Sequence, residues 1–329
     1  MEKTTEIKTS GTDSSVCCSP KTHRHNVRIC GGVWSAAPTP FNVNWNIDTA
    51  SVLRMVEHHF RLGIKGLFLC GTNGEGPWLT DAQRQTLVRA VVRYVRGRLP
   101  IAVQVTDNSA ARILDNVKMA KAEGADIAVI APPYFISNAT PDHIRGIYLN
   151  AIDRSTLPVG IYDRGKFASV VVPDNVLRDI YTHPKVAIIK DSSAIPGRME
   201  IALEAKRRRP ELCLLNGNEF NCVQYLRAGY DGLLLGGGVF NGHLAAGIAE
   251  AVHNGDLKRA ERLQTKMNRM MWMVYGGKQI ACWLAGEKYL LVRLGLFKTY
   301  LNYPQYPLFD SCRRAIEKTI IKNRKWLLP

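Results

Sequence analysis

The chain has 329 residues, of which 46% are hydrophobic and 22% charged, an ordinary composition for a globular protein with a substantial core. The sequence contains no run of about 18 apolar residues, which argues against a transmembrane helix. The formal net charge is +16, but the basic residues are scattered, without zinc-finger spacing or a base-stacking aromatic array. We therefore expect no nucleic-acid or membrane partner, and we interpret the charge as a basic surface that steers small anionic substrates.

The first 27 residues are polar and lack the apolar segment of a secretory signal. The acidic residues Glu2, Glu6 and Asp13 also argue against an organellar transit peptide. We interpret residues 1–27 as a flexible tail, and we expect the protein to be cytoplasmic.

The cysteines give no sign of a metal site or a disulfide framework. The chain has 8 cysteines and no C-x-x-C pair. Cys17 and Cys18 lie near His23 and His25, but no further residues complete a ligand set. We expect no metal, and we interpret most of the other cysteines as buried thiols in a reducing compartment.

From residue 30 onward, short apolar runs alternate with amphipathic segments. The runs are continuously apolar, as in strands that are buried on both faces. The predicted strands are Cys30–Ala37, Gly66–Cys70, Ile101–Val105, Ile127–Ala131, Pro158–Tyr162, Val186–Lys190, Cys213–Asn216 and Gly232–Leu235. The predicted helices between them are Thr49–Leu62, Thr80–Val95, Asn108–Ala122, Pro141–Ile152, Pro173–Tyr181, Arg198–Arg208 and Glu219–Ala228.

This repetition of strand and helix predicts parallel strands joined by right-handed crossovers. Repeating units of this kind close most naturally as a (β/α)₈ TIM barrel, which we place at residues 28–252. A doubly wound open sheet is the alternative, but no G-x-G-x-x-G follows the first strand.

Only helices are predicted after the last strand. Asn241–Val252 is expected to close the barrel. Residues 253–329 form a C-terminal helical extension that packs against the barrel or a partner subunit. Its predicted helices are Leu257–Met273, Lys278–Leu294 and Asp310–Asn323.

The second predicted strand runs into a glycine-rich turn, Gly71-Thr72-Asn73-Gly74-Glu75-Gly76. Chemistry in a TIM barrel gathers at the carboxyl ends of the strands, where this turn lies. Its glycines bring backbone N–H groups close to a ligand, and the absence of a P-loop lysine favours a carboxylate over a triphosphate. The alternative is a glycine-rich turn with a purely structural role.

Lys190 ends the sixth predicted strand and Tyr162 ends the fifth. A buried ammonium loses hydration, which lowers its pKa and frees the amine to attack a carbonyl. A tyrosine at a neighbouring strand end suits proton transfer. The alternatives are a lysine that extends to solvent and a tyrosine that fills the barrel. The last two strands end in Asn216-Gly217-Asn218 and Gly236-Gly237-Gly238, which leave room for a ligand.

Together these residues resemble the family of dihydrodipicolinate synthase and N-acetylneuraminate lyase. The matching features are Gly71-Thr72-Asn73-Gly74-Glu75, Tyr162, and Lys190 placed 28 residues after Tyr162. Pro38-Thr39-Pro40-Phe41 and Pro132-Pro133-Tyr134 are similar to the family segments after the first and fourth strands. The resemblance spans residues 30 to about 300 in consistent order.

The resemblance implies a class I enzyme in which Lys190 forms a Schiff base with a 2-oxo acid. Tyr162 would transfer protons, and Thr72 would bond to both the tyrosine and the substrate carboxylate. The N–H groups of Thr72 and Asn73 would hold that carboxylate, and Gly217 would line the pocket beside the imine. No metal or organic cofactor is implied, and family members are commonly homotetramers.

Three positions depart from the synthase pattern. Phe167 stands where synthases have an arginine that binds the carboxylate of the second substrate. The loss of this guanidinium argues against a role of the protein in lysine biosynthesis. Arg164 and Lys166 are near in sequence but are expected to point elsewhere. Asn73 replaces a threonine, and Phe135 replaces the tyrosine that a neighbouring subunit contributes.

The sequence thus favours the lyase and sugar-acid aldolase branches. The leading hypothesis is a lyase or aldolase that cleaves or forms a C–C bond of a 2-oxo-3-deoxy acid, with pyruvate and an aldehyde as products or substrates. A dehydratase or hydratase-aldolase on a related 2-oxo acid is the alternative within the same chemistry. An inactive relative that serves as a binding or scaffold protein is the alternative from another class.

Overall fold

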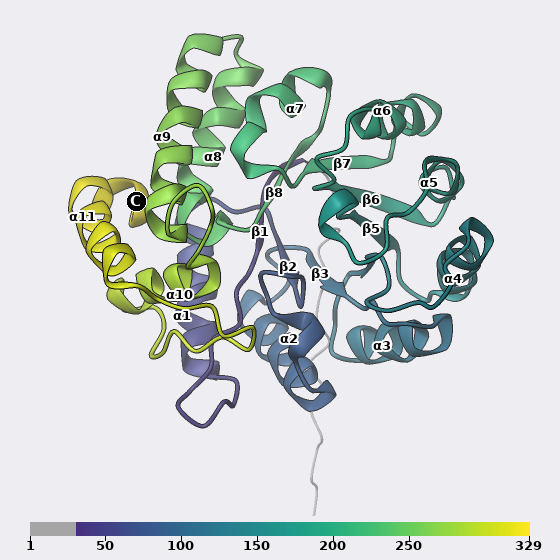
Figure 1. Cartoon of the computed structure of the whole chain (residues 1–329), viewed down its shortest axis with the longest axis horizontal. Coiled ribbons are helices and arrows are strands. Elements are labelled where there is room, and N and C mark those ends of the chain that lie inside the picture. Colours follow the sequence, from purple (N-terminus) through teal and green to yellow (C-terminus); the bar gives the residue numbers. More distant parts are fainter. Residues whose placement is uncertain (1–30) are drawn as a thin grey trace, which may run out of the picture.

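The structure, a computed structural model, describes residues 31–329, and its elements form a closed parallel barrel with additional helices at one side (Figure 1). The predicted tail and the Cys17–Cys18 pair lie outside the described residues. The strands are β1 (Gly32–Ala36), β2 (Gly66–Leu69), β3 (Ile101–Gln104), β4 (Ile127–Ile130), β5 (Val159–Asp163), β6 (Val186–Asp191), β7 (Cys213–Asn216) and β8 (Gly232–Leu235).

Each strand pairs in parallel with the next, and β8 pairs with β1 to close the barrel. The helices around it are α1 (Thr49–Arg61), α2 (Asp81–Val95), α3 (Ala110–Ala122), α4 (Pro141–Arg154), α5 (Asp174–Tyr181), α6 (Arg198–Arg208), α7 (Cys222–Ala228) and α8 (Gly238–His253). The prediction of a TIM barrel is therefore confirmed.

The barrel has two apolar layers, as expected when strands are covered on both faces. Inward-facing residues such as Trp34, Phe68 and Leu215 fill its interior. Outward-facing residues such as Leu67 and Ile189 pack with the surrounding helices. Gly66 leaves space for the Trp34 ring inside the barrel, because a Cβ atom at this position would lie 2.3 Å from that ring. The barrel is thus a packed core rather than a pore, which leaves the strand ends to form a site.

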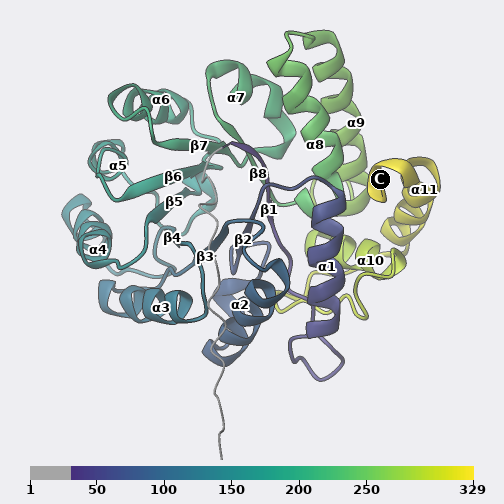
Figure 2. The same cartoon turned by 180° about the vertical axis from the view of Figure 1, so that it is seen from behind.

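The C-terminal extension consists of α9 (Leu257–Tyr275), α10 (Trp283–Arg293) and α11 (Asp310–Leu327). Helix α9 packs against α8, and α11 packs against both α9 and α8. Seen from behind, α8, α9, α10 and α11 lie on the side of the barrel where α1 lies (Figure 2). The extension therefore packs against its own barrel, the first of the two arrangements that the sequence allowed.

Helix α10 begins later than predicted, at Trp283 instead of Lys278. Gly276, Gly277 and Ile280 have positive φ angles of 83°, 92° and 54°, in the left-handed region that a right-handed helix cannot contain. The chain between α9 and α10 is consequently a turn.

No helix in the described part of the chain is long and apolar enough to span a membrane.

Candidate active site

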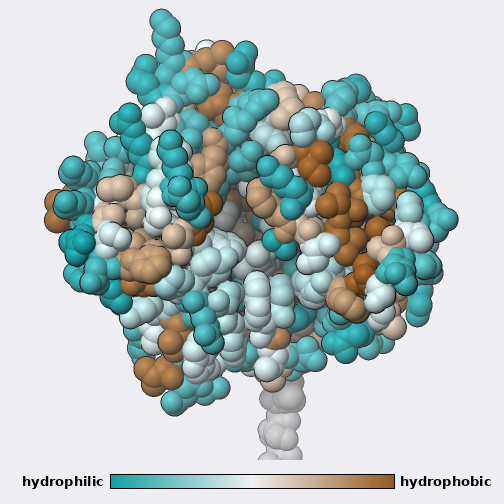
Figure 3. All heavy atoms as spheres, in the orientation of Figure 1, coloured by the Kyte–Doolittle hydropathy of each residue, from teal (hydrophilic) through white to brown (hydrophobic). Residues whose placement is uncertain are grey.

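A cavity of about 560 Å³ lies at the carboxyl ends of the barrel strands, and the face shown in Figure 3 is hollowed near its centre. The predicted residues Thr72, Asn73, Tyr162, Lys190 and Gly217 all line this cavity. The other lining residues are Ala36, Arg164, Phe167, Ser192, Ala194, Asn218, Glu219, Phe220, Gly236, Tyr275, Gln279, Ile280, Trp283 and Tyr306.

Lys190 and Tyr162 are register partners on the neighbouring strands β6 and β5. The Lys190 Nζ atom lies 4.1 Å from the centroid of the Tyr162 ring and 4.9 Å from that of Phe68. Only 5% of Lys190 and 7% of Tyr162 are exposed. The amine is therefore buried against aromatic faces, beside a phenol.

Burial and charge shift both groups toward the states that imine chemistry needs. Burial lowers the pKa of Lys190, and this effect outweighs the negative charges of Tyr162 and Glu219, which act in the opposite direction. Burial alone would raise the pKa of Tyr162, but the positive charges of Lys190 and Arg164 prevail and lower it. Hydrogen bonds with Thr72 and Ser192 lower the Tyr162 pKa further. A more readily neutral amine beside a more acidic phenol favours proton exchange between them.

Gly217 gives Lys190 the space that it occupies. A Cβ atom at this position would lie 3.0 Å from Lys190 Cε and 1.9 Å from Ser192 Oγ. The Gly217 N–H donates to the Asp191 carbonyl at 2.6 Å, which fixes the backbone beside β6. A side chain cannot be added here without moving the lysine or the serine.

The loop after β2 presents free backbone donors beside the tyrosine. Glu75 N–H donates to the Thr72 carbonyl and Gly76 N–H to the Gly71 carbonyl, both at 3.1 Å, which fold the loop into a compact turn. The N–H groups of Thr72 and Asn73 donate to no other residue within 31–329. Two unpaired amides at the cavity wall suit a carboxylate.

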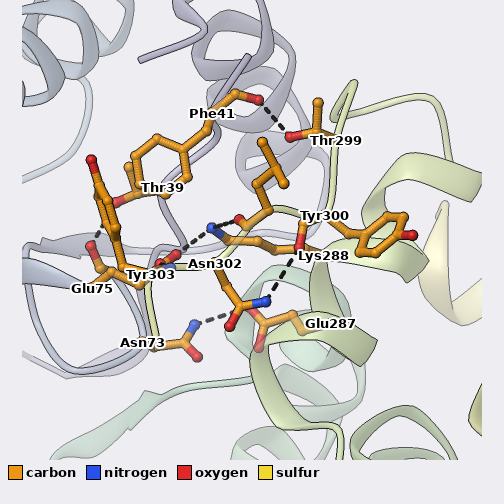
Figure 4. A network of polar contacts seen from close by, with 12 residues as sticks. Thr39, Phe41, Asn73, Glu75, Glu287, Lys288, Thr299, Tyr300, Asn302 and Tyr303 are labelled. Atoms are coloured by element: carbon orange, nitrogen blue, oxygen red, sulfur yellow. Dashed lines mark hydrogen bonds and ion pairs between the residues drawn. The ribbon is translucent and has the colours of Figure 1, made fainter. Parts of the chain in front are cut away.

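The Asn73 side chain has a structural contact that the sequence did not reveal. Its Nδ2 lies 2.9 Å from the Ala36 carbonyl, 3.1 Å from the Gly236 carbonyl and 2.9 Å from Glu287 Oε1 (Figure 4). The amide hydrogens are thus directed to acceptors within the protein. A contact between Asn73 and substrate carboxylate remains a prediction for its backbone N–H.

A buried charge network ties the same loop to α10. Glu75, Glu287 and Lys288 have no exposed surface, and Lys288 forms an ion pair with Glu75 (Figure 4). Lys288 also donates to the Leu301 carbonyl at 2.7 Å, while Glu75 accepts from the Tyr303 N–H at 2.7 Å. Burial raises the pKa of Glu287 well above its usual range. Two adjacent charged residues in a largely apolar helix, Glu287 and Lys288, are the sequence feature that could have indicated this network.

The extension also supplies part of the cavity wall. Gln279, Ile280, Trp283 and Tyr306 come from the turn before α10, its first turn and the segment after it. Tyr275, at the end of α9, donates to Glu219 Oε1 at 3.0 Å. Sequence reasoning missed these residues because nothing local indicates that a helix after the barrel folds back over the strand ends.

Some of the positions that depart from the synthase pattern line the cavity and others do not. Phe167 lines the cavity although it is 59% exposed, and Arg164 lines it as well, contrary to the expectation that Arg164 points elsewhere. Phe135 is 68% exposed and is not a lining residue. Tyr134 accepts a hydrogen bond from Gln104 at 2.9 Å. No group of three metal-ligating side chains occurs within residues 31–329.

Known proteins of two kinds are similar to most of this chain. A 4-hydroxy-tetrahydrodipicolinate synthase from Maridesulfovibrio salexigens is 25% identical over 291 residues, covering 87% of this chain and 96% of that protein. An N-acetylneuraminate lyase from Salmonella typhimurium is 28% identical over 291 residues, covering 86% and 90%. Relatives of both branches match at similar identity, so these identities do not assign the chain to one branch.

Solved structures agree with the fold. A dihydrodipicolinate synthase from Bacteroides thetaiotaomicron superposes with a TM-score of 0.81 at 26% identity, covering 89% of this chain and 99% of that one. The Acinetobacter baumannii enzyme complexed with pyruvate gives 0.80 at 20% identity, covering 91% and 99%. Residues 30–323 match the model of the Dihydrodipicolinate synthetase family. The chain therefore belongs to the dihydrodipicolinate synthetase family.

Proposed function

We propose that this protein is a class I lyase or aldolase that joins or separates pyruvate and an aldehyde through a Schiff base on Lys190. The observation that carries this proposal is the buried Lys190 amine, whose pKa is lowered beside Tyr162 in an open cavity. A lysine with these properties is suited to attack a carbonyl rather than to form an ion pair. Family membership supports the same chemistry.

In the proposed reaction the neutral Lys190 amine attacks C2 of the 2-oxo acid to give a carbinolamine. Tyr162 returns a proton to the departing hydroxyl, water leaves and a protonated imine remains. Tyr162, now a phenolate, accepts the proton of the C4 hydroxyl, the C3–C4 bond breaks to release the aldehyde, and the electron pair moves into the imine to form an enamine. Protonation at C3 and addition of water release pyruvate and restore the free amine.

The substrate carboxylate is assigned to the loop after β2. Thr72 and Asn73 offer two unpaired N–H groups, and the Thr72 side chain bonds to Tyr162. A carboxylate bound by these groups would lie beside the proton-transferring phenol, and this supports a role of the loop in orienting the 2-oxo acid for attack. Gly217 keeps the opposite side of Lys190 open.

Two alternatives to this assignment make different predictions. A dehydratase or hydratase-aldolase would use the same Lys190 imine but release water, or add it, at a neighbouring carbon. A scaffold protein without activity would gain nothing from an open cavity beside a buried amine that forms no ion pair within residues 31–329, and the volume of about 560 Å³ therefore favours an enzyme. We also propose a homo-oligomer, with a tetramer as the expected state, which light scattering would test.

The test is a screen of 2-oxo-3-deoxy acids of different chain length, with pyruvate release followed by a coupled assay and aldehyde release measured separately. We expect pyruvate and aldehyde in equal amounts from at least one acid, and no release by Lys190→Ala. Loss of substrate without aldehyde would assign the dehydratase alternative. Undiminished turnover by Lys190→Ala would overturn the proposed chemistry.

A further inference from the structure

Part of the cavity wall is apolar and has no role in the proposed reaction. Five large apolar side chains line the cavity, and we call them the apolar rim: Phe167, Phe220, Ile280, Trp283 and Tyr306. Each keeps part of its surface exposed, and the exposed fraction of Phe167 is 59%. The reacting amine and phenol belong to side chains that are only 5% and 7% exposed. The cavity therefore leads from a partly exposed apolar rim to the reactive pair at the strand ends.

Ring contacts hold the rim in place. Trp283 and Tyr306 form a T-shaped pair, with ring centroids 5.4 Å apart and planes at 81°. Phe220 stacks on Trp272, with centroids 6.2 Å apart and planes at 17°. Three of the four aromatic rings in the rim are thus fixed by a neighbouring ring in the protein itself. A preformed apolar wall of this kind loses little conformational entropy when it binds a ligand.

Polar side chains between the rim and the reactive pair already have partners within the protein. Glu219 accepts the Gly237 N–H at 2.7 Å and the Tyr275 hydroxyl at 3.0 Å. The Asn218 side chain forms a hydrogen bond with Tyr225. Each hydroxyl of a sugar chain would need a hydrogen-bond partner here, because a hydroxyl buried without one weakens binding. The wall is therefore better suited to an apolar group than to a polyhydroxylated chain.

The charges of the wall do not favour a charged aldehyde either. Apart from Lys190, the lining has one guanidinium, Arg164, and one carboxylate, Glu219, so their formal charges sum to zero. The positive charge of Arg164 acts on the reactive pair, where it lowers the pKa of Lys190 and that of Tyr162. An uncharged group on the substrate is the one most compatible with this balance.

We propose that the apolar rim binds an aromatic ring, so that the aldehyde joined to pyruvate or released with it is an aryl aldehyde. Four of the five rim side chains are aromatic, and pairs of aromatic rings attract each other beyond the apolar area that they bury. This inference rests on the proposed function and deepens it, because it identifies the group at C4 of the 2-oxo acid. In cleavage the C4 hydroxyl loses its proton as the C3–C4 bond breaks, and C3 gains a proton afterwards. The step therefore needs no oxidant or reductant.

The test compares 4-hydroxy-2-oxo acids that share the reacting atoms and differ in the group on C4. This group is phenyl, cyclohexyl, methyl or 1,2-dihydroxyethyl. Pyruvate release is followed by a coupled assay, aldehyde release is measured by chromatography, and kcat/KM is determined for each acid. We expect kcat/KM of the phenyl acid to exceed that of the methyl and dihydroxyethyl acids about 10- to 100-fold, because the ring is buried against the rim. It should exceed that of the cyclohexyl acid about 2- to 10-fold through the contacts between aromatic rings.

A trapping assay establishes that the imine forms in the same preparation. The protein is incubated with increasing concentrations of pyruvate and reduced with borohydride, and the label on Lys190 is measured by mass spectrometry. This assay depends on Lys190 and pyruvate but not on the group at C4. It therefore separates a failure of the proposed function from a failure of the aromatic site.

Variants of the rim separate binding by the protein from the intrinsic reactivity of each acid. Phe167→Ala removes a largely exposed ring, so the fold should tolerate it, and the ratio of kcat/KM for the phenyl acid to that for the methyl acid should fall about 10-fold. Trp283→Ala should lower the same ratio, mainly by raising KM for the phenyl acid. Phe309→Ala is the matched control, because Phe309 is 51% exposed and does not line the cavity. The control should keep the wild-type ratio.

Three results would overturn the inference. Protein that traps pyruvate on Lys190 but cleaves the phenyl acid no faster than the methyl or dihydroxyethyl acid, or not at all, has no aromatic site. A cyclohexyl acid cleaved as fast as the phenyl acid would show a general apolar site instead. A ratio that Phe167→Ala and Trp283→Ala both leave unchanged would assign the preference to other residues. If pyruvate is not trapped at all, the proposed function itself fails, and this outcome is distinct from the other three.

Discussion

Replacing Lys288 by methionine should destabilise the protein strongly, because it removes one partner of a fully buried ion pair. Methionine keeps most of the apolar stem, but Glu75 would retain a buried negative charge with the Tyr303 N–H as its one remaining donor among residues 31–329. Breaking a buried pair in this way costs about 3 to 5 kcal/mol. An unfolding entropy of about 2.1 cal/mol/K per residue converts this cost to a fall in Tm of about 4 to 7 °C for a chain of this length.

The double variant Glu75→Gln with Lys288→Met should recover part of this loss. Glutamine still accepts from the Tyr303 N–H but carries no charge, so the buried anion is removed. Urea unfolding gives the free energies, and calorimetry gives the Tm values. Lys118→Met is the matched control, because the Lys118–Asp115 pair is 75% and 73% exposed and should contribute less than about 1 kcal/mol.

A loss below about 1 kcal/mol for Lys288→Met would refute the reasoning, since it falls well short of the cost of an unpaired buried carboxylate. A double variant less stable than Lys288→Met alone would refute it as well. Because Glu75 belongs to the loop that carries Thr72, Lys288→Met should also raise the half-saturation concentration of pyruvate in the trapping assay more than the control does.

Three further predictions concern the site. Burial raises the pKa of Glu287, so wild-type stability should fall as pH rises above the unfolded-state value of about 4.3. In Glu287→Gln this contribution is absent, and the stability of the variant relative to wild type should increase between pH 5 and 8 in urea unfolding; a constant difference would contradict this. Glu219→Gln removes a charge that raises the pKa of Lys190, so the pH midpoint of imine formation should move downward, and an upward shift would contradict the assignment. Gly217→Ala should slow pyruvate trapping at least about 10-fold through a ΔΔG‡ above 1.4 kcal/mol, because its Cβ would lie 1.9 Å from Ser192 Oγ, and an unchanged rate would show that the pocket adapts.

The barrel and the central pair of the site could be predicted from sequence because they depend on local patterns. Continuous apolar runs mark buried strands, and the carboxyl ends of successive parallel strands must lie at one end of a barrel. That rule is sufficient to place Tyr162 beside Lys190, and the structure shows them as register partners.

Contacts over long sequence distances could not be predicted in the same way. Lys288 and Glu75 are 213 residues apart, and Glu287 and Asn73 are 214 apart. No local pattern shows that α10 returns over the loop after β2. The predicted start of α10 was wrong for a local reason, because residues with left-handed backbone interrupt a segment that otherwise has helical composition. The orientation of Arg164 was missed because it depends on the seating of Gly165 against Ser193.

The most direct test of the central claim is peptide mapping after the protein is incubated with pyruvate and reduced with borohydride. The account predicts one reduced pyruvyl group, attached at Lys190 and absent from Lys190→Ala. Lys288 is the internal comparison, because it is also buried but is paired with Glu75 and does not line the cavity. Labelling at Lys288 or another lysine, or labelling that persists in Lys190→Ala, would contradict the assignment of Lys190 as the Schiff-base residue.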